Sequence, residues 1–341
     1  MATKPPVEVP QGAIRLNTQS QKLEFYAQDQ WWEMATEIAI PIGGRGLNGG
    51  GLRPVAVNSI DYINMESAGD AVDFGDLVRK LPVGGSGASR TRGIFFGGYS
   101  QGQPTWSLDN TIDYVTIASK GNAIDFGDKN TESIWTNQGI ASNNTHAFSC
   151  GGTTNPSTVN QIVRLTISTT GSVSDFADMT GQGEVSCGSL STPTRLFMCG
   201  GGPATAPSTT VYENIEYITM STAANGTDFG DLTFQGRHFC GASNGTRGII
   251  GGGWAHPTAY STLQVLSLAS KGDAVNFGDL DCNMSGHGAC NSPIRSFWYG
   301  GSESWIQEVS FSTLSGPTKW GDTTTSGKAQ NQTLSNAHGG V

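Results

Sequence analysis

Short runs in which apolar and polar side chains alternate recur along most of the chain. The run Ile60-Asp61-Tyr62-Ile63 is typical, and related runs stand at residues 112–115, 162–165, 215–218, 263–266 and 306–309. Alternation with a period of two predicts β-strands that bury one face. The pattern therefore predicts an all-β protein that is built from repeats.

A second motif follows each of these runs. The tetrapeptide Asp73-Phe74-Gly75-Asp76 returns unchanged at residues 125–128 and 228–231, and as variants at 175–178, 276–279 and 319–322. Its aromatic position recurs every 43 to 53 residues. Glycine pairs mark the same period at residues 97–98, 151–152, 201–202, 252–253 and 300–301. A period of this size indicates an array of repeats or a propeller.

Four short strands can be assigned to each repeat. Around residue 240 the first two strands are residues 237–243 and 246–250, the third is 263–268, and the fourth ends in Phe-Gly-Asp. The array opens on a second strand near Arg45, and residues 329–335 have the pattern of a first strand. We expect this last segment to complete the first sheet, which gives six blades. Seven is the alternative, because Gly339-Gly340 is a further glycine pair and residues 37–42 suit an extra strand.

A four-stranded repeat with a double glycine after strand two and aromatic residues in strands three and four resembles the kelch repeat. The resemblance covers residues 37–341, although phenylalanine mostly replaces the tryptophan that is usual in kelch strand four. It implies a closed β-propeller.

The first 36 residues lie outside the repeats. Residues 2–10 are rich in proline and should be extended. Residues 11–34 then show alternation, with turns expected at Gln19-Ser20 and Gln28-Asp29, which predicts two or three antiparallel strands. So small a β unit has too little core to be stable alone. We expect it to dock on the main domain or on another chain through its apolar residues, namely Ile14, Leu16, Leu23, Phe25, Tyr26, Trp31 and Trp32.

Composition excludes several classes of function. The formal net charge is −9 and no cluster of lysine and arginine stands out, so nucleic-acid binding is not expected. There is no apolar run long enough for a membrane span, and the first residues lack the apolar stretch of a signal peptide. The six cysteines contain no Cys-x-x-Cys pair, and most occupy equivalent positions in successive repeats. We expect them to be small buried side chains rather than zinc ligands or disulfides.

The Asp-Phe-Gly motif also belongs to the metal site of protein kinases. Here it recurs in nearly every repeat, without the phosphate loop or catalytic loop of kinases. We expect a structural role, in which the aspartates bond turn amides and the phenylalanine packs between blades. Calcium at the aspartate pairs would be one alternative, but the spacing of an EF-hand or RTX site is absent. A copper centre among the five histidines would be another, but we expect these histidines to lie on different blades. No catalytic residue, metal or cofactor is predicted, and a propeller enzyme is the least favoured alternative.

Binding is expected where the repeats differ, on the loops that connect strand two to strand three and strand four to strand one. These loops carry aromatic and histidine residues of the type that recognition surfaces use. The competing interpretation is that the same side chains pack the loops onto the blades. The candidates are Trp106, Trp135, Trp254, His256, Tyr260 and Trp305.

The N-terminal residues 10–18, together with Lys22-Leu23-Glu24-Phe25-Tyr26 and Trp31, resemble a short module at the start of tail-fibre and other virion proteins of bacteriophages. Residues 112–117 and 121–128 are similar to propellers of marine phage structural proteins, cyanophages among them. The resemblance implies a non-enzymatic virion protein, assembled in the host cytoplasm. Residues 1–36 would dock on other virion proteins, within an oligomeric assembly. Residues 37–341 would be displayed for attachment to a host receptor or glycan, or as a decoration. A cellular kelch-type adaptor that binds a peptide or glycan is the second hypothesis.

Overall fold

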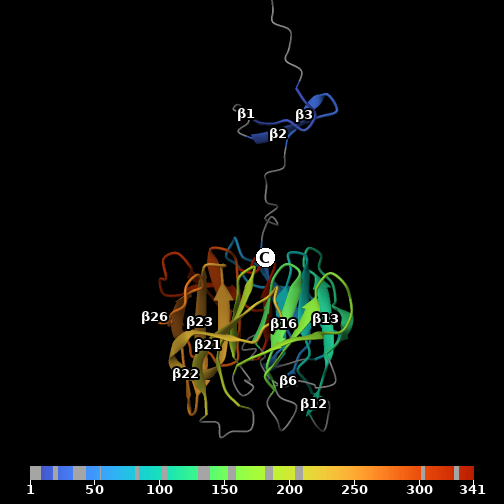
Figure 1. The fold of residues 1–341 in the computed structure, drawn as a ribbon. Coiled ribbons are helices and arrows are strands. Elements are labelled where there is room, and N and C mark those ends of the chain that lie inside the picture. Colours follow the sequence, from blue (N-terminus) through green and yellow to red (C-terminus); the bar gives the residue numbers. More distant parts are fainter. Residues whose placement is uncertain are drawn as a thin grey trace, which may run out of the picture. The chain divides into compact units, whose positions relative to one another are not determined.

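The computed structural model describes residues 9–17, 22–33, 44–53, 55–80, 84–101, 106–129, 139–152, 159–180, 187–203, 210–300, 304–325 and 330–341 (Figure 1). The described residues form strands and turns and contain no helix. The chain divides into two compact units, Met1–Ile42 and Gly43–Val341. The boundary expected between residues 36 and 37 and the extra strand considered at residues 37–42 both lie outside the described residues.

The first unit is a three-stranded antiparallel sheet of β1 (Ile14–Asn17), β2 (Lys22–Ala27) and β3 (Gln30–Glu33). Gln28 and Asp29 connect β2 to β3 with φ angles of 52° and 59°. Two successive left-handed residues form the turn that best fits the twist of a hairpin. This matches the turn expected from the sequence at this point, whereas the one expected at residues 19–20 lies outside the described residues.

The second unit contains four-stranded antiparallel sheets, which we number 1 to 6 along the chain. In each sheet the strands follow the sequence order, except that the last strand of the chain joins sheet 1. Sheet 1 has the order β31 (Gln332–Ser335), β4 (Arg45–Gly49), β7 (Ser59–Asn64), β8 (Val72–Asp76). Sheet 2 is β9 (Gly85–Ala88), β10 (Arg92–Phe96), β13 (Thr111–Thr116), β14 (Ile124–Asp128). Sheet 3 is β15 (Gly139–Ser142), β16 (His146–Cys150), β17 (Gln161–Thr166), β18 (Ser174–Asp178).

Sheets 4 and 5 share one long strand, β22 (Thr227–Ser243), whose first part is the fourth strand of sheet 4 and whose last part is the first strand of sheet 5. Sheet 4 also contains β19 (Gly188–Ser191), β20 (Arg195–Gly201) and β21 (Tyr212–Thr219). Sheet 5 continues with β23 (Arg247–Ala255), β25 (Thr262–Ser267) and β26 (Val275–Asp279). Sheet 6 is β27 (Gly288–Asn291), β28 (Arg295–Tyr299), β29 (Trp305–Ser310) and β30 (Thr318–Asp322).

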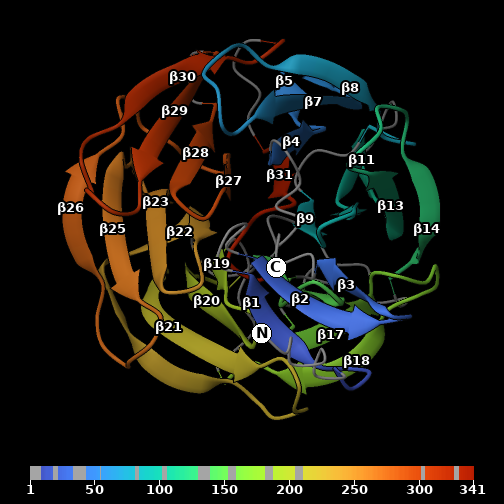
Figure 2. The same cartoon turned by 90° about the horizontal axis from the view of Figure 1, so that it is seen from above.

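The sheets of the second unit lie around a common centre (Figure 2). Their first strands are innermost and contact one another in the order β31, β9, β15, β19, β22, β27 and again β31. Strand β31 pairs with β4, with Gln332 opposite Gly49 and Ser335 opposite Gly46. The expectation that residues 329–335 supply the first strand of the first sheet is therefore met by the part of that segment that forms β31.

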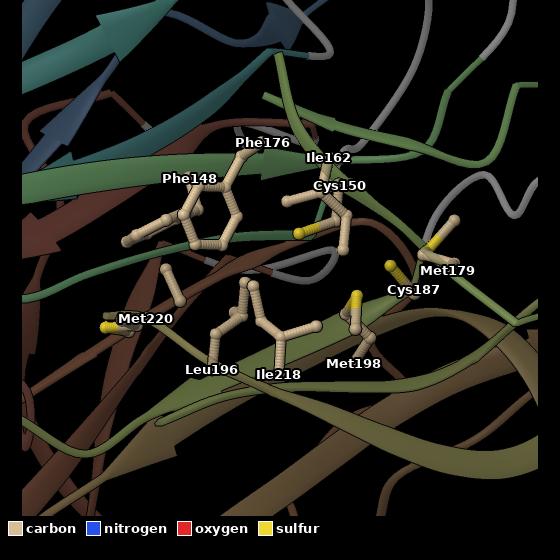
Figure 3. Packing of buried hydrophobic residues seen from close by; sticks show 11 residues of the cluster. Phe148, Cys150, Ile162, Phe176, Met179, Cys187, Leu196, Met198, Ile218 and Met220 are labelled. Atoms are coloured by element: carbon tan, nitrogen blue, oxygen red, sulfur yellow. The ribbon is translucent and has the colours of Figure 1, made fainter. Parts of the chain in front are cut away.

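Apolar side chains fill the space between neighbouring sheets. Between sheets 3 and 4, Phe148 and Phe176 face Leu196, Ile218 and their neighbours across a closely packed layer (Figure 3). Phe148 and Phe176 meet edge to face with ring centroids 5.2 Å apart. The aromatic residue of the repeated tetrapeptide thus packs between sheets, as expected. Five of the six cysteines are buried in such layers and Cys282 is half-buried.

The repeated tetrapeptide makes a second contact, at the outer edge. In sheet 2 the carbonyl of Phe126 accepts a hydrogen bond from the amide of Gly171 (3.0 Å), and that of Asp128 accepts one from Val173 (3.3 Å) in sheet 3. Equivalent bonds join sheets 1 and 2, 3 and 4, 4 and 5, and 6 and 1. The last of these links Trp320 to Gly69 at 3.1 Å. We call this backbone pairing the outer contact.

Polar side chains also bridge neighbouring sheets. Arg92 donates to the carbonyls of Ile167 and Ser168 at 3.0 and 2.9 Å, and Arg45 and Arg247 make equivalent bonds. In the third strands, a side-chain carboxylate or amide oxygen accepts a hydrogen bond from a backbone N–H group of the preceding sheet. Asp113, for example, accepts one from Val78 at 3.0 Å. Glu216, Gln264 and Gln307 do the same. The second position of the Ile-Asp-Tyr-Ile runs therefore joins sheets, a role that alternation alone does not reveal.

Three short hairpins correct the sequence interpretation of the loops. Tyr99–Gln101 (β11) pairs with Trp106–Leu108 (β12), Leu52–Arg53 (β5) pairs with Val55–Ala56 (β6), and Thr258–Ala259 (β24) pairs with the end of β23. Trp106 and Trp254 are thus strand residues, and Trp305 is the first residue of β29. These strands extend beyond their alternating apolar runs because backbone hydrogen bonding continues past the ends of the runs. The alternation of apolar and polar side chains carries no information about this pairing.

Candidate recognition and docking sites

One face of the first unit is apolar. Ile14 pairs with Phe25 and Phe25 pairs with Trp32, so the three side chains form a row across the strands. Ile14 and Leu16 are about 60% exposed, and Phe25 and Trp32 about 40%. Leu23 pairs with Leu16 in the same register, while its side chain lies outside what the structure describes. We call Ile14, Leu16, Phe25 and Trp32 the apolar face.

The opposite face of this unit is polar and internally bonded. Arg15 lies over the ring of Trp31, 4.0 Å from its centroid, and forms an ion pair of 2.7 Å with Glu24. Tyr26 packs against Trp31 with ring centroids 5.3 Å apart. Asn17 also donates to Glu24, and these hydrogen bonds lower the pKa of the Glu24 carboxyl. The predicted docking residues therefore divide into two groups, since Tyr26 and Trp31 stabilise the unit and the apolar face is left uncovered.

The predicted recognition residues are not gathered in one place. Trp106 lies in the separate two-stranded sheet of β11 and β12 and Trp305 in sheet 6, whereas Trp135 falls outside the described residues. Trp254 lies near the end of β23, and His256 and Tyr260 follow it in the connection to β25 in sheet 5. Of the predicted residues that the structure describes, these three share a local cluster.

The sheet 5 cluster contains more residues than the sequence suggested. Trp254 contacts the ring of His256 with centroids 5.5 Å apart, and Arg237 lies over Trp254 at 4.7 Å. Tyr260 packs on Phe234 at 4.5 Å. Trp254 and Tyr260 are half-buried, while His256 is exposed. The cluster supports both interpretations of the loop aromatics, because its rings pack on one another and still present one exposed member.

A cavity of about 130 Å³ lies along the centre of the second unit, lined by the first strands of the sheets. Its wall consists mainly of glycine, serine, alanine and other small residues, with His287, Asn331 and His338 among the larger polar ones. In the part of the chain that the structure describes, no aspartate, glutamate, lysine or arginine lines it. The sequence does not mark Asn331 as a site residue, because its repeat equivalents share no chemistry with it.

His338 lies at one end of this cavity. Its Nε2 donates to the carbonyl of Ala88 at 2.9 Å, and its Nδ1 accepts from the amide of Gly340 at 3.1 Å. These bonds require the neutral ring with the proton on Nε2. Burial lowers the pKa of His338 to about 4, and does the same for His287, so both rings are neutral at physiological pH. The described part of the cavity wall is therefore uncharged.

In the described ranges, no group of three His, Cys, Asp or Glu side chains is arranged to hold a metal ion. The same residues contain no helix with the length and apolar character needed to cross a bilayer. Comparison with known proteins adds no homologue, since no protein-family model matches the chain and no curated protein is significantly similar to it.

Proposed function

We propose that this chain is a non-enzymatic structural protein of a bacteriophage particle, anchored by its first unit and displaying its second unit for attachment or recognition. The observation that carries the proposal is the apolar face of Ile14, Leu16, Phe25 and Trp32 on a unit whose other face is internally bonded. An uncovered row of large apolar side chains on so small a sheet favours a protein partner. The resemblance of residues 10–31 to virion modules gives the class of that partner.

We further infer that the displayed unit is a closed six-bladed propeller. Two observations support closure: the cycle of contacts among the first strands, and the outer contact between sheets 6 and 1, which repeats the contact between other neighbouring sheets. Gly339 and Gly340, considered as part of a seventh repeat, lie in a turn after β31. A closed ring leaves no free inner edge for other chains to pair with, which suits a domain held at high local concentration on a particle.

The anchoring proposal is tested on particles purified from the host that makes the chain. The double variant Phe25→Ser, Trp32→Ser should be absent from particles by mass spectrometry, because it removes most of the aromatic area of the apolar face. Its matched control is Val275→Ser, which removes an even more exposed apolar side chain, 61% exposed, from the second unit. The control should be incorporated at the level of the unmodified chain.

Two results would contradict the proposal. Wild-type chain missing from purified particles would exclude a virion protein. Normal incorporation of the double variant would exclude docking through the apolar face. A chain that instead keeps a cellular partner after deletion of residues 1–36 would favour the adaptor hypothesis, for which the sheet 5 cluster of Trp254, His256 and Tyr260 offers a surface.

A further inference from the structure

The side chains of the first strands form successive tiers around the axial cavity, and side-chain hydrogen bonds join neighbouring sheets in two of these tiers. In one tier, Ser86 donates to the carbonyl of Thr333 at 2.7 Å and Ser189 to that of Ile140 at 2.6 Å. In the next tier, Ser335 donates to the carbonyl of Asn291 at 2.6 Å. The equivalent positions in other sheets are similarly bonded through Ser142, Ser243 and Asn291. These two tiers hold the ring together.

The third tier, at the starts of the first strands, differs from the other two. It contains Gly84, Cys187, Phe239, His287 and Asn331, all of which line the cavity. Asn331 is 7% exposed, yet neither its Oδ1 nor its Nδ2 has a hydrogen-bond partner among the described residues. The Nδ1 atom of His287 has none either. Buried polar groups in native proteins are almost always paired, so this tier is built to bond something that enters the cavity.

The register places a further amide beside Asn331. Asn48 in β4 lies opposite Thr333 and is fully buried, with both amide atoms unpaired among the described residues. Asn48 is thus a diagonal cross-strand neighbour of Asn331, close enough for long side chains or one intervening small group to connect them. Asn331 directly precedes β31 and His287 directly precedes β27. These two strands contact each other.

The chemistry of the tier selects an uncharged ligand. An asparagine amide offers one acceptor and two donors, and a neutral imidazole adds one more bonding atom. Among the described residues, no charged side chain lines the cavity to compensate a ligand charge, and a buried uncompensated charge is costly. Phe239 lines the same tier, but its ring packs between sheets 4 and 5 against Phe234. Uncharged groups that both donate and accept hydrogen bonds therefore suit the tier, and a sugar ring presents several hydroxyl groups of this kind along one edge.

Cavity size limits how much of the ligand enters. A volume of 130 Å³ holds about four water molecules at their liquid volume, which is less than a whole oligosaccharide needs. The half-exposed Ser86, Ser189 and Thr333 show that solvent reaches the centre of the ring. One hydroxylated edge of a terminal sugar fits this space, with the remainder of the glycan outside.

We propose that the axial cavity binds the edge of a neutral sugar through the amide of Asn331 and the ring of His287. This deepens the recognition role and in that respect rests on the proposed function. It is tested on the purified full chain, so its failure leaves anchoring through the first unit untouched.

The test compares three sugars of similar shape and different charge. Saturation-transfer NMR with D-glucose, D-glucuronate and D-glucosamine should show transfer to glucose and at least a tenfold weaker effect with the two charged sugars. Equal or stronger binding of a charged sugar would overturn the uncharged-site argument. A high-resolution crystal structure from a glucose soak that shows only ordered water at Asn331 and no sugar signal in solution would overturn the proposal altogether.

Two variants assign the residues. Asn331→Leu keeps the side-chain shape and removes an unpaired buried amide, so it should weaken glucose binding by about tenfold while leaving the thermal midpoint equal or higher. His287→Phe keeps the ring and removes its nitrogens, with the same expected result. Asn283→Leu, an exposed asparagine outside the cavity lining, is the matched control and should bind as the wild type does. A lower midpoint with unchanged glucose binding in Asn331→Leu would assign Asn331 a purely structural role.

Discussion

Gly127 provides a direct test of how the sheets are held together. It lies in the repeated tetrapeptide of sheet 2 with a φ angle of 146°, a conformation that residues with a Cβ rarely adopt. A Cβ added there would stand 2.6 Å from the carbonyl oxygen of Gly171 in sheet 3. The neighbouring backbone bond from Gly171 to Phe126, part of the outer contact, lies directly beside this point.

Gly127→Ala should therefore be costly. The strained conformation contributes about 1–3 kcal/mol and the clash with a backbone atom, which cannot rotate away as a side chain does, a similar amount. Some of the clash is relieved if the outer contact lengthens, so we expect a net loss of roughly 2–4 kcal/mol. For a domain of this size, such a loss lowers the thermal midpoint by about 5 °C.

Gly278→Ala is the matched control within the same motif. Gly278 is the equivalent glycine of sheet 5, but its φ is not in the left-handed region, and no atom lies within 4 Å of the position that an added Cβ would take. Its substitution should leave the midpoint unchanged or raise it slightly, because alanine restricts the unfolded chain. Both variants are measured by calorimetry or by circular dichroism on the full chain. Equal destabilisation of the two would refute the outer contact as the reason for glycine in the tetrapeptide.

Three further predictions test other contacts. Arg92→Met should lower the midpoint by a few degrees, because it removes two bonds to the neighbouring sheet and stacking on Tyr114, whereas the exposed Arg90→Met should not. Burial lowers the pKa of three histidines to about 4, so the folded chain binds fewer protons than the unfolded chain between pH 4 and 6.5. Their contribution to stability is thus present above pH 6.5 and lost as pH falls toward 4, and His338→Gln should flatten the midpoint-versus-pH curve in that range. Among the cysteines, a thiol reagent should modify half-buried Cys282 in the native protein before the five buried ones.

The repeated parts of the fold were predictable because each of their sequence patterns occurs about six times along the chain. The Ile60-Asp61-Tyr62-Ile63 pattern predicts the third strands, and the expected first strand at residues 329–335 is found as β31 beside β4. The recurrence of Asp-Phe-Gly in most repeats also favoured a structural role for this motif over a catalytic one. Here Asp125 accepts the amide of Gly127, and Phe126 is buried between sheets.

The candidate site was harder to predict because it depends on what differs between repeats. Asn331 aligns with Gly84, Cys187, Phe239 and His287, so no shared residue type marks its tier. Which way its side chain points depends on strand parity, and a one-residue error in register would place it on the opposite face. Likewise, the seven predicted docking residues gave no sign that Tyr26 and Trp31 lie on the bonded face, since that division follows from the pairing of β2 with β3.

The junction of sheets 5 and 6 shows that sequence departures from the repeat have physical consequences. In the described residues, no outer contact joins these two sheets, and Pro317, which has no N–H to donate, stands in the loop that carries the donors elsewhere. The inner and lateral bonds are present instead. Asn291 exchanges hydrogen bonds with the backbone of Ser243, and Arg247 donates to the carbonyl of Phe311 at 2.6 Å. Pro317, a Gly278 without a left-handed φ angle and the missing outer contact thus occur at the same junction. The complete Asp-Phe-Gly-Asp motif occurs only in sheets where it joins the next sheet through the outer contact.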